Sequence, residues 1–121
     1  GYHSYAIAKP ETDKETFLRN YYYKYSYVMS SNGNSYTMNK DGYKLPNSWI
    51  IDAVNLSVAA SYQWDVVSAS LDAGWAHCGS IDADKTRFSK AVVRKKSGIK
   101  FIDTNNSTED FESDAKPTLF K

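Results

Sequence analysis

The sequence predicts a small α+β domain: an antiparallel sheet of about four strands with one main helix packed on one face. Three observations predict this class. The chain has 121 residues and a mass of 13.7 kDa, which suits one domain with a modest core. Several segments alternate in polarity and are rich in tyrosine or valine, as strands are. One stretch, 48–61, repeats apolar residues at steps of three and four, as an amphipathic helix does.

The first forty residues predict a short helix followed by a hairpin. Thr12-Asp-Lys-Glu15 has the spacing of a capping box, so a helix is expected over about 13–20. The tyrosine-rich segment 21–30 alternates like a strand. Asn32-Gly33 favours a type I′ turn, because both residues tolerate positive φ, and 35–38 is expected to return as the second strand.

The second half predicts the main helix and the remaining strands. The helix is placed at about 48–61, since its apolar stripe needs a sheet face to cover it. Segment 62–71 alternates and contains valine and aromatic residues, so it is expected to be a central strand. Residues 75–81 suit either a short strand or an irregular loop. A strand is predicted over 87–95, and a last edge strand over 100–102.

We expect a single domain over 1–121, with an ordered core over about 12–102. Residues 103–121 are polar and acidic, which predicts a flexible tail. No apolar run is long enough to span a bilayer. Cys78 is the one cysteine, so the chain cannot form an intrachain disulfide or a cysteine-rich zinc site. The polar composition also suits an exported bacterial protein.

Charge is unevenly distributed, although the net charge is only +1. Residues 85–100 hold seven basic residues and no acidic one, whereas 103–121 hold five acidic residues and two lysines. Three interpretations stay open. The acidic tail folds back and neutralises the basic segment, or both segments are solvated faces, or the basic segment faces an anionic ligand.

Three segments together resemble a small bacterial domain family of unknown function. Tyr23-Lys-Tyr-Ser-Tyr-Val28 is similar to the first strand of that family. Tyr62-Gln-Trp-Asp-Val-Val-Ser68 is similar to a strand that begins Gly-Trp-Glu-Leu-Val-Ser, with Gln63 in place of the glycine. Arg87-Phe-Ser-Lys-Ala-Val-Val-Arg-Lys95 is similar to its closing strand. The resemblance implies a small α+β sheet domain in β-α-β-β order, and no activity or catalytic residue.

No residue pattern indicates catalysis or a metal site. His77 and Cys78 are adjacent, and neighbours in a strand point to opposite faces, so the imidazole is badly placed to activate the thiol. Asp82 and Asp84 lack the further ligands of a calcium loop. No catalytic residue, metal or cofactor is therefore predicted. A small enzyme would need a site that these patterns do not mark.

Tyrosine is the strongest signal in the chain. Residues 21–27 contain five tyrosines together with Lys24, and they occupy both faces of the predicted strand. We expect one face to lie under the main helix and the other to form an exposed patch, although ordinary cross-strand packing is the simpler interpretation. The candidate binding residues are Tyr22, Tyr25, Tyr27, Trp75 and Arg94.

These observations predict a non-catalytic binding or protein-interaction module, which binds a protein partner or associates with itself, because tyrosine is enriched at interface centres. The alternative is single-stranded nucleic acid or another anionic ligand bound on a Tyr, Lys and Arg sheet surface. A net charge of only +1 argues against nucleic acid.

Overall fold

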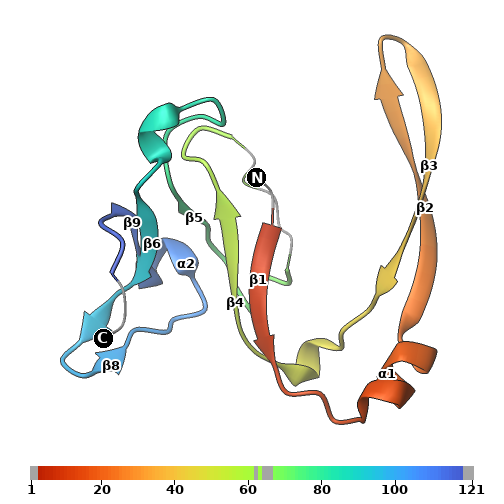
Figure 1. The fold of residues 1–121 in the computed structure, drawn as a ribbon, viewed down its shortest axis with the longest axis horizontal. Coiled ribbons are helices and arrows are strands. Elements are labelled where there is room, and N and C mark those ends of the chain that lie inside the picture. The colour runs from red at the N-terminus through yellow and green to blue at the C-terminus, as the bar shows by residue number, and fades with distance from the viewer. Residues whose placement is uncertain (1–2, 62, 64–66, 119–121) are drawn as a thin grey trace. The chain divides into compact units, whose positions relative to one another are not determined.

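The structure, a computed structural model, describes residues 3–61, 63 and 67–118. The chain divides into two compact units, which are described separately (Figure 1). The hairpin unit is Lys9–Trp49. The sheet unit comprises the described residues of Gly1–Ala8 and Ile50–Lys121. No helix among the described residues has the length and apolar character needed to span a bilayer.

The hairpin unit consists of one helix, two long strands and a short 3-10 turn. The predicted helix is confirmed, but its cap differs from the prediction: the side chain of Asp13, not Thr12, accepts a hydrogen bond from the backbone N–H of Thr16 at 2.9 Å. The elements are α1 (Lys14–Asn20), β2 (Tyr22–Ser31), β3 (Asn34–Tyr43) and the 3-10 turn η1 (Asn47–Trp49).

The predicted turn between β2 and β3 is confirmed. Asn32 has a φ of 51° and Gly33 a φ of 78°, and two positive φ values define a type I′ turn. Antiparallel pairing then continues without a register shift from the pair Ser31 and Asn34 to the pair Tyr22 and Tyr43. The second strand is therefore longer than its sequence pattern indicated.

An aromatic cluster holds α1 against the base of the hairpin. The Phe17 ring lies 5.2 Å from the Tyr21 ring and 5.5 Å from the Tyr43 ring, centroid to centroid. The buried Trp49 lies 5.0 Å from the Tyr21 ring. This cluster covers only the base of the hairpin. Every residue of β2, which runs from the base to the tip, is exposed.

The sheet unit contains several short strands in three small sheets. One sheet has the order β1-β4-β5, in which β4 and β5 run parallel, and β6-β9 and β7-β8 form two-stranded sheets. The elements are β1 (His3–Ala8), β4 (Ile50–Ser57), β5 (Ala76–His77), the 3-10 turn η2 (Lys85–Arg87), β6 (Ala91–Arg94), β7 (Lys96–Ser97), β8 (Lys100–Phe101), α2 (Ser107–Asp110) and β9 (Phe111–Ala115).

The predicted main helix over 48–61 is wrong. After the short turn η1, the chain forms strand β4, which pairs with β1. Ala53, Asn55 and Ser57 alternate as buried positions, which is the period of a strand and not of a helix. Asn55 is 1% exposed: its backbone N–H donates to Asp72 Oδ2 at 2.6 Å and its Nδ2 donates to the Asp72 carbonyl at 3.3 Å, whereas its Oδ1 has no hydrogen-bond partner among the described residues.

The prediction of a four-stranded antiparallel sheet under one helix is therefore also wrong, since the described strands form several small sheets. Residues 62 and 64–66 of the expected strand over 62–71 lie outside the described residues, and Ser68 and Leu71 in its last part form a turn, closed by a 2.8 Å backbone hydrogen bond. The expected single domain stays a prediction.

The acidic segment from residue 103 onward is ordered where it is described, in contrast to the expected flexible tail. It forms α2 and β9, and β9 pairs with β6 of the basic segment. Lys90 lies 3.6 Å from Asp114, and Arg94 lies 3.9 Å from Asp103. The acidic segment thus returns to the basic one and offsets part of its charge.

The buried interior of the sheet unit is small and unusually polar. Its buried apolar residues are Ala53, Val58, Ala76 and Ala115. Its buried polar residues are Asn55, Ser57, Asp72, Ser107 and Asp110. Because alanine and valine bury little apolar area, hydrogen bonds carry much of the specificity of this unit.

Candidate functional site

One face of the hairpin collects aromatic and apolar side chains. Successive residues of a strand point to opposite faces, and the register opposes Tyr23 with Gly42 and Tyr27 with Met38. The odd-numbered residues of β2 therefore share a face with the even-numbered residues of β3. We call this surface the tyrosine face; its residues are Tyr23, Tyr25, Tyr27, Met29, Ser31, Asn34, Tyr36, Met38, Lys40 and Gly42.

The tyrosine face is open to solvent. Tyr23 and Tyr25 stack at 5.4 Å with an interplanar angle of 19°, and Tyr25 and Tyr27 stack at 6.3 Å and 25°. These rings nevertheless remain 42–45% exposed, Met29 46% and Tyr36 48%. The side chains pack against one another, and no other element of the hairpin unit buries them.

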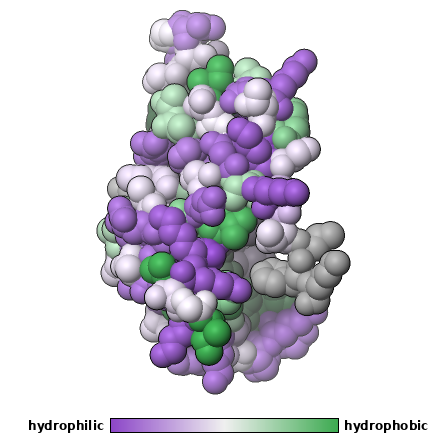
Figure 2. Space-filling view, turned by 90° about the vertical axis from the view of Figure 1, so that its left-hand side faces the viewer, coloured by the Kyte–Doolittle hydropathy of each residue, from purple (hydrophilic) through white to green (hydrophobic). Residues whose placement is uncertain are grey.

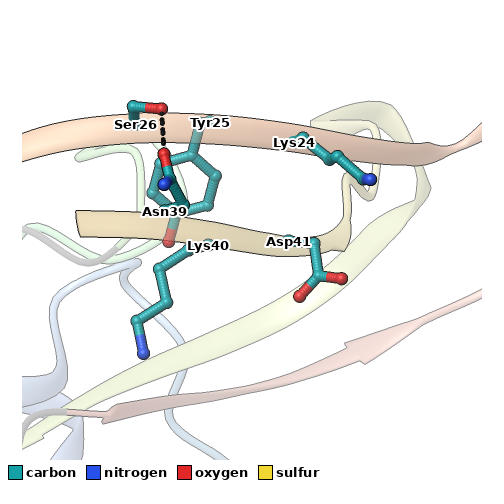
Figure 3. A pocket seen from close by; sticks show the side chains of 6 residues that line it. All are labelled: Lys24, Tyr25, Ser26, Asn39, Lys40 and Asp41. Atoms are coloured by element: carbon teal, nitrogen blue, oxygen red, sulfur yellow. Dashed lines mark hydrogen bonds between the residues drawn. The ribbon is translucent and has the colours of Figure 1, made fainter. Parts of the chain in front are cut away.

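The opposite face of the hairpin is mainly polar, with Tyr22, Val28 and Tyr43 as its exposed large side chains. Ser26 Oγ donates to Asn39 Oδ1 at 2.7 Å, and an open hollow lies around this pair, lined also by Lys24, Tyr25, Lys40 and Asp41 (Figure 3). The hydroxyl of Tyr22 donates to Asp41 at 2.5 Å. This hydrogen bond, together with the negative charge of Asp41, raises the pKa of Tyr22. The two faces thus differ. Polar groups of the opposite face form hydrogen bonds across the strands, whereas the apolar side chains of the tyrosine face are not covered.

Charge is almost absent from the outer part of the hairpin. Residues 25–39 contain no Asp, Glu, Lys or Arg. Lys40 is the one charged residue of the tyrosine face. A surface of this composition favours contacts through rings, methyl groups and hydroxyls over contacts through charge.

A groove in the sheet unit is the second candidate for a site. Tyr5 and Ile7 of β1 line it together with Phe101 and Phe111. Arg94 also lines it, but its guanidinium is already held: Nη1 lies 2.6 Å from Asp52 Oδ2, and the Phe111 ring lies 4.9 Å away. On the side of the molecule that carries β6 and β8 in Figure 1, hydrophobic residues appear as separate spots among hydrophilic ones (Figure 2).

Asp72 is a buried carboxylate of the sheet unit that is held in a network of backbone hydrogen bonds. Asp72 accepts backbone hydrogen bonds from Asn55 at 2.6 Å, Ser107 at 2.7 Å and Gly74 at 2.9 Å. A Cβ atom at position 74 would clash with the Asn106 side chain, so the close approach requires glycine. This network joins three distant segments and leaves its central carboxylate no room for a substrate.

Two residues weighed in the sequence analysis, Cys78 and Asp84, have shifted pKa values. Burial raises the pKa of the Cys78 thiol, which makes the nucleophilic thiolate scarcer. Asp84 caps η2, and hydrogen bonds from Thr86 and Ser80 lower its pKa. Among the described residues, no group of three or more His, Cys, Asp or Glu side chains is arranged to hold a metal ion.

The structure divides the predicted binding residues between the two units. Tyr25 and Tyr27 lie on the tyrosine face, and Tyr22 lies on the opposite, polar face. Trp75 and Arg94 belong to the sheet unit and are half-buried. The backbone N–H of Trp75 donates to Thr108 Oγ1 at 3.1 Å, and Arg94 pairs with Asp52 as described above.

Sequence reasoning missed Tyr36, Met38 and Lys40 as members of the candidate site. The signal that finds them is the Asn32-Gly33 turn. A two-residue turn fixes the register, and the register assigns every residue of β3 to a face.

Comparison with curated proteins and comparison with solved structures found no match to this chain. A family model does match, over residues 1–118, which is nearly the whole chain. The expectation of a family without an assigned activity is confirmed, and the chain belongs to the family described as "Protein of unknown function (DUF4876)".

Proposed function

We propose that the chain is a non-catalytic protein-interaction module whose contact surface is the tyrosine face. One observation carries the proposal: an ordered row of stacked tyrosines stands on a hairpin whose residues in β2 are all exposed. A two-stranded hairpin by itself is only marginally stable in water, so a partner that covers one face stabilises it.

The size of the exposed surface supports a binding role. Taking about 200 Å² for a tyrosine or methionine side chain, the exposed fractions of the five large residues amount to roughly 450 Å². Contiguous apolar patches of about 300–600 Å² are often functional in soluble proteins. The five residues are Tyr23, Tyr25, Tyr27, Met29 and Tyr36.

The charge distribution favours a polypeptide partner over nucleic acid. Single-stranded nucleic acid needs a positively charged groove beside the aromatic rings, and the tyrosine face supplies Lys40 alone. Stacked tyrosines with hydroxyl tips suit the side chains and backbone of another strand. We therefore expect a fluorescent oligothymidylate to show no salt-sensitive binding to the hairpin.

Selection from a display library of short random peptides tests the proposal. We expect the wild-type protein to enrich peptides that are rich in aromatic and β-branched residues. Their affinity should fall by about tenfold or more in the double variant Tyr25→Ser and Tyr27→Ser, because two ring contacts are removed. The matched control is Val28→Ser with Thr37→Ser, a pair on the opposite face.

The control variant should retain wild-type affinity, and amide NMR signals of the Asn32-Gly33 turn should report an intact hairpin in all three proteins. Failure to enrich any peptide at protein concentrations at which the chain is monomeric contradicts the proposal. So does an affinity that is the same for the tyrosine variant and the wild-type protein.

A further inference from the structure

We infer that the occupant of the tyrosine face is a second copy of this chain, packed face to face and antiparallel about a two-fold axis. This inference rests on the proposed function, because it names the partner of the same surface. It follows from the self-complementarity of the face, from its charge and from its area.

Two copies of the face fit one another when the base of one hairpin lies over the tip of the other. In this arrangement β2 lies over the partner's β2 and β3 over the partner's β3, as in two aligned sheets about 10 Å apart. From base to tip, β3 presents Gly42, Lys40, Met38 and Tyr36. Gly42 thus opposes the partner's Tyr36, so the residue without a side chain lies opposite the bulkiest side chain of this row.

The rows of β2 match in the same way. From base to tip, β2 presents Tyr23, Tyr25, Tyr27 and Met29. Reversing one copy opposes Tyr25 with the partner's Tyr27, and Tyr23 with the partner's Met29. These are ring–ring and ring–sulfur contacts, which are favourable between buried side chains.

Lys40 is the one charged residue of the face, and it does not meet its own copy in the antiparallel arrangement. Reversing one copy places Lys40 opposite the partner's Met38, so the two lysines lie two residues apart along the strands. A parallel arrangement, base on base, brings both lysines to the same level. Residues 25–39 contain no charge, so the chain offers no feature that would select a partner of different sequence by charge.

The area agrees with a concentration-dependent dimer. Two faces of roughly 450 Å² bury about 900 Å², before Met38 and Lys40 are included. A specific interface is expected to bury about 1,000 Å² or more, so the pair falls just below that value, as a weak dimer does. The isologous contact closes on itself and yields a dimer, not a filament.

Solution mass tests the inference with one matched pair of variants. Gly42→Lys adds a side chain to the tyrosine face, where a Cβ atom meets nothing within 4 Å in the single chain, so the variant should fold. Thr37→Lys adds the same charge to the opposite face. We measure the mass of wild-type and variant proteins by light scattering over a range of concentrations.

We expect the wild-type mass to rise from 13.7 kDa to twice that value with concentration. Thr37→Lys should behave as the wild type, whereas Gly42→Lys and the double variant Tyr25→Ser and Tyr27→Ser should weaken dimerisation by about tenfold or more. A wild type that stays monomeric overturns the inference. Equal dimerisation of Gly42→Lys and Thr37→Lys overturns it as well.

These results separate the inference from the proposed function. If the wild type is monomeric but still selects peptides through Tyr25 and Tyr27, the second copy is not the partner, and the proposed function remains supported. If peptide selection also fails, both are contradicted.

A distance measurement tests the orientation. Spin labels attached through Ser31→Cys, in a Cys78→Ser background, report the separation of the two hairpin tips. Ten residues of strand span about 33 Å, so the antiparallel arrangement predicts tips separated by roughly that length. A tip-to-tip separation of about 10 Å overturns the antiparallel arrangement.

Discussion

Replacing Asp72 with alanine is expected to destabilise the sheet unit by about 3–5 kcal/mol. Asp72 is 2% exposed, and its carboxylate accepts the backbone N–H groups of Asn55, Gly74 and Ser107. Alanine leaves three buried donors without an acceptor, and each such donor costs about 1–3 kcal/mol. The effect is large because the apolar interior of this unit is too small to compensate.

Hydrogen exchange measured by mass spectrometry checks this result within one molecule. Peptides from 50–58 and 72–79 should exchange faster in Asp72→Ala, whereas peptides from 22–43, in the hairpin unit, should be unchanged. Asp82→Ala is the matched control, because Asp82 is 54% exposed and its ion pair with Arg87 is worth at most about 1 kcal/mol. Unchanged exchange in Asp72→Ala would show that the network is not what holds the unit together.

Replacing Asp110 with asparagine is expected to cost the sheet unit about 2–4 kcal/mol at neutral pH. Asp110 is 1% exposed and accepts hydrogen bonds from the Thr104 backbone at 2.9 Å, the Thr104 hydroxyl at 2.8 Å and the Asn106 backbone at 3.4 Å. Asparagine has nearly the same shape, but an NH₂ group replaces one of the two acceptor oxygens. The NH₂ group then faces the donors that this oxygen accepted from, and those hydrogen bonds are lost.

The pH dependence of this difference follows from the pKa of Asp110. Burial raises that pKa, but the hydrogen bonds from Thr104 and Asn106 and the charge of Arg94 lower it more, so it lies below the ordinary 3.8 in the folded state. A depressed carboxyl pKa stabilises the fold at pH values above the unfolded-state pKa. The stabilisation is lost as the pH falls from about 4 through the folded-state pKa.

We therefore expect the stability difference between wild type and Asp110→Asn to be full at pH 7 and to shrink below about pH 4. The measurement is the protection of the 91–94 and 111–115 peptides at each pH, corrected for intrinsic exchange rates. Other carboxyl groups titrate equally in both proteins, so the difference isolates Asp110. A difference that is constant from neutral pH to acid would contradict the proposed role of its ionised form.

Sequence analysis predicted well the elements whose conformation is determined by residues adjacent in the chain. The type I′ turn follows from Asn32-Gly33, and the helix near 13–20 follows from its capping residues. The conformation of strand β4 is not determined in this way. Its apolar residues fit helical spacing by chance, and only the partners of Asn55, which lie at Asp72 and Gly74, make a buried asparagine acceptable in a strand.

The candidate site was predictable in part for the same reason. Tyr25 and Tyr27 follow from alternation within one strand. Trp75 and Arg94 were chosen for residue type, which does not report burial. Asp52, the partner of Arg94, is 42 residues away in sequence, so its ion pair depends on a tertiary contact that no local pattern marks.

The central claim is that the tyrosine face is exposed in the single chain. Hydroxyl-radical footprinting of dilute protein tests this most directly, since the oxidation rate of a side chain, divided by the rate of the free amino acid, reports its contact with water. We predict rapid oxidation of Tyr23, Tyr25, Tyr27, Met29 and Tyr36, and slow oxidation of Trp49, which is 6% exposed. If the tyrosines of β2 are protected as strongly as Trp49 in the monomer, another part of the same chain covers the tyrosine face, and its proposed exposure is contradicted.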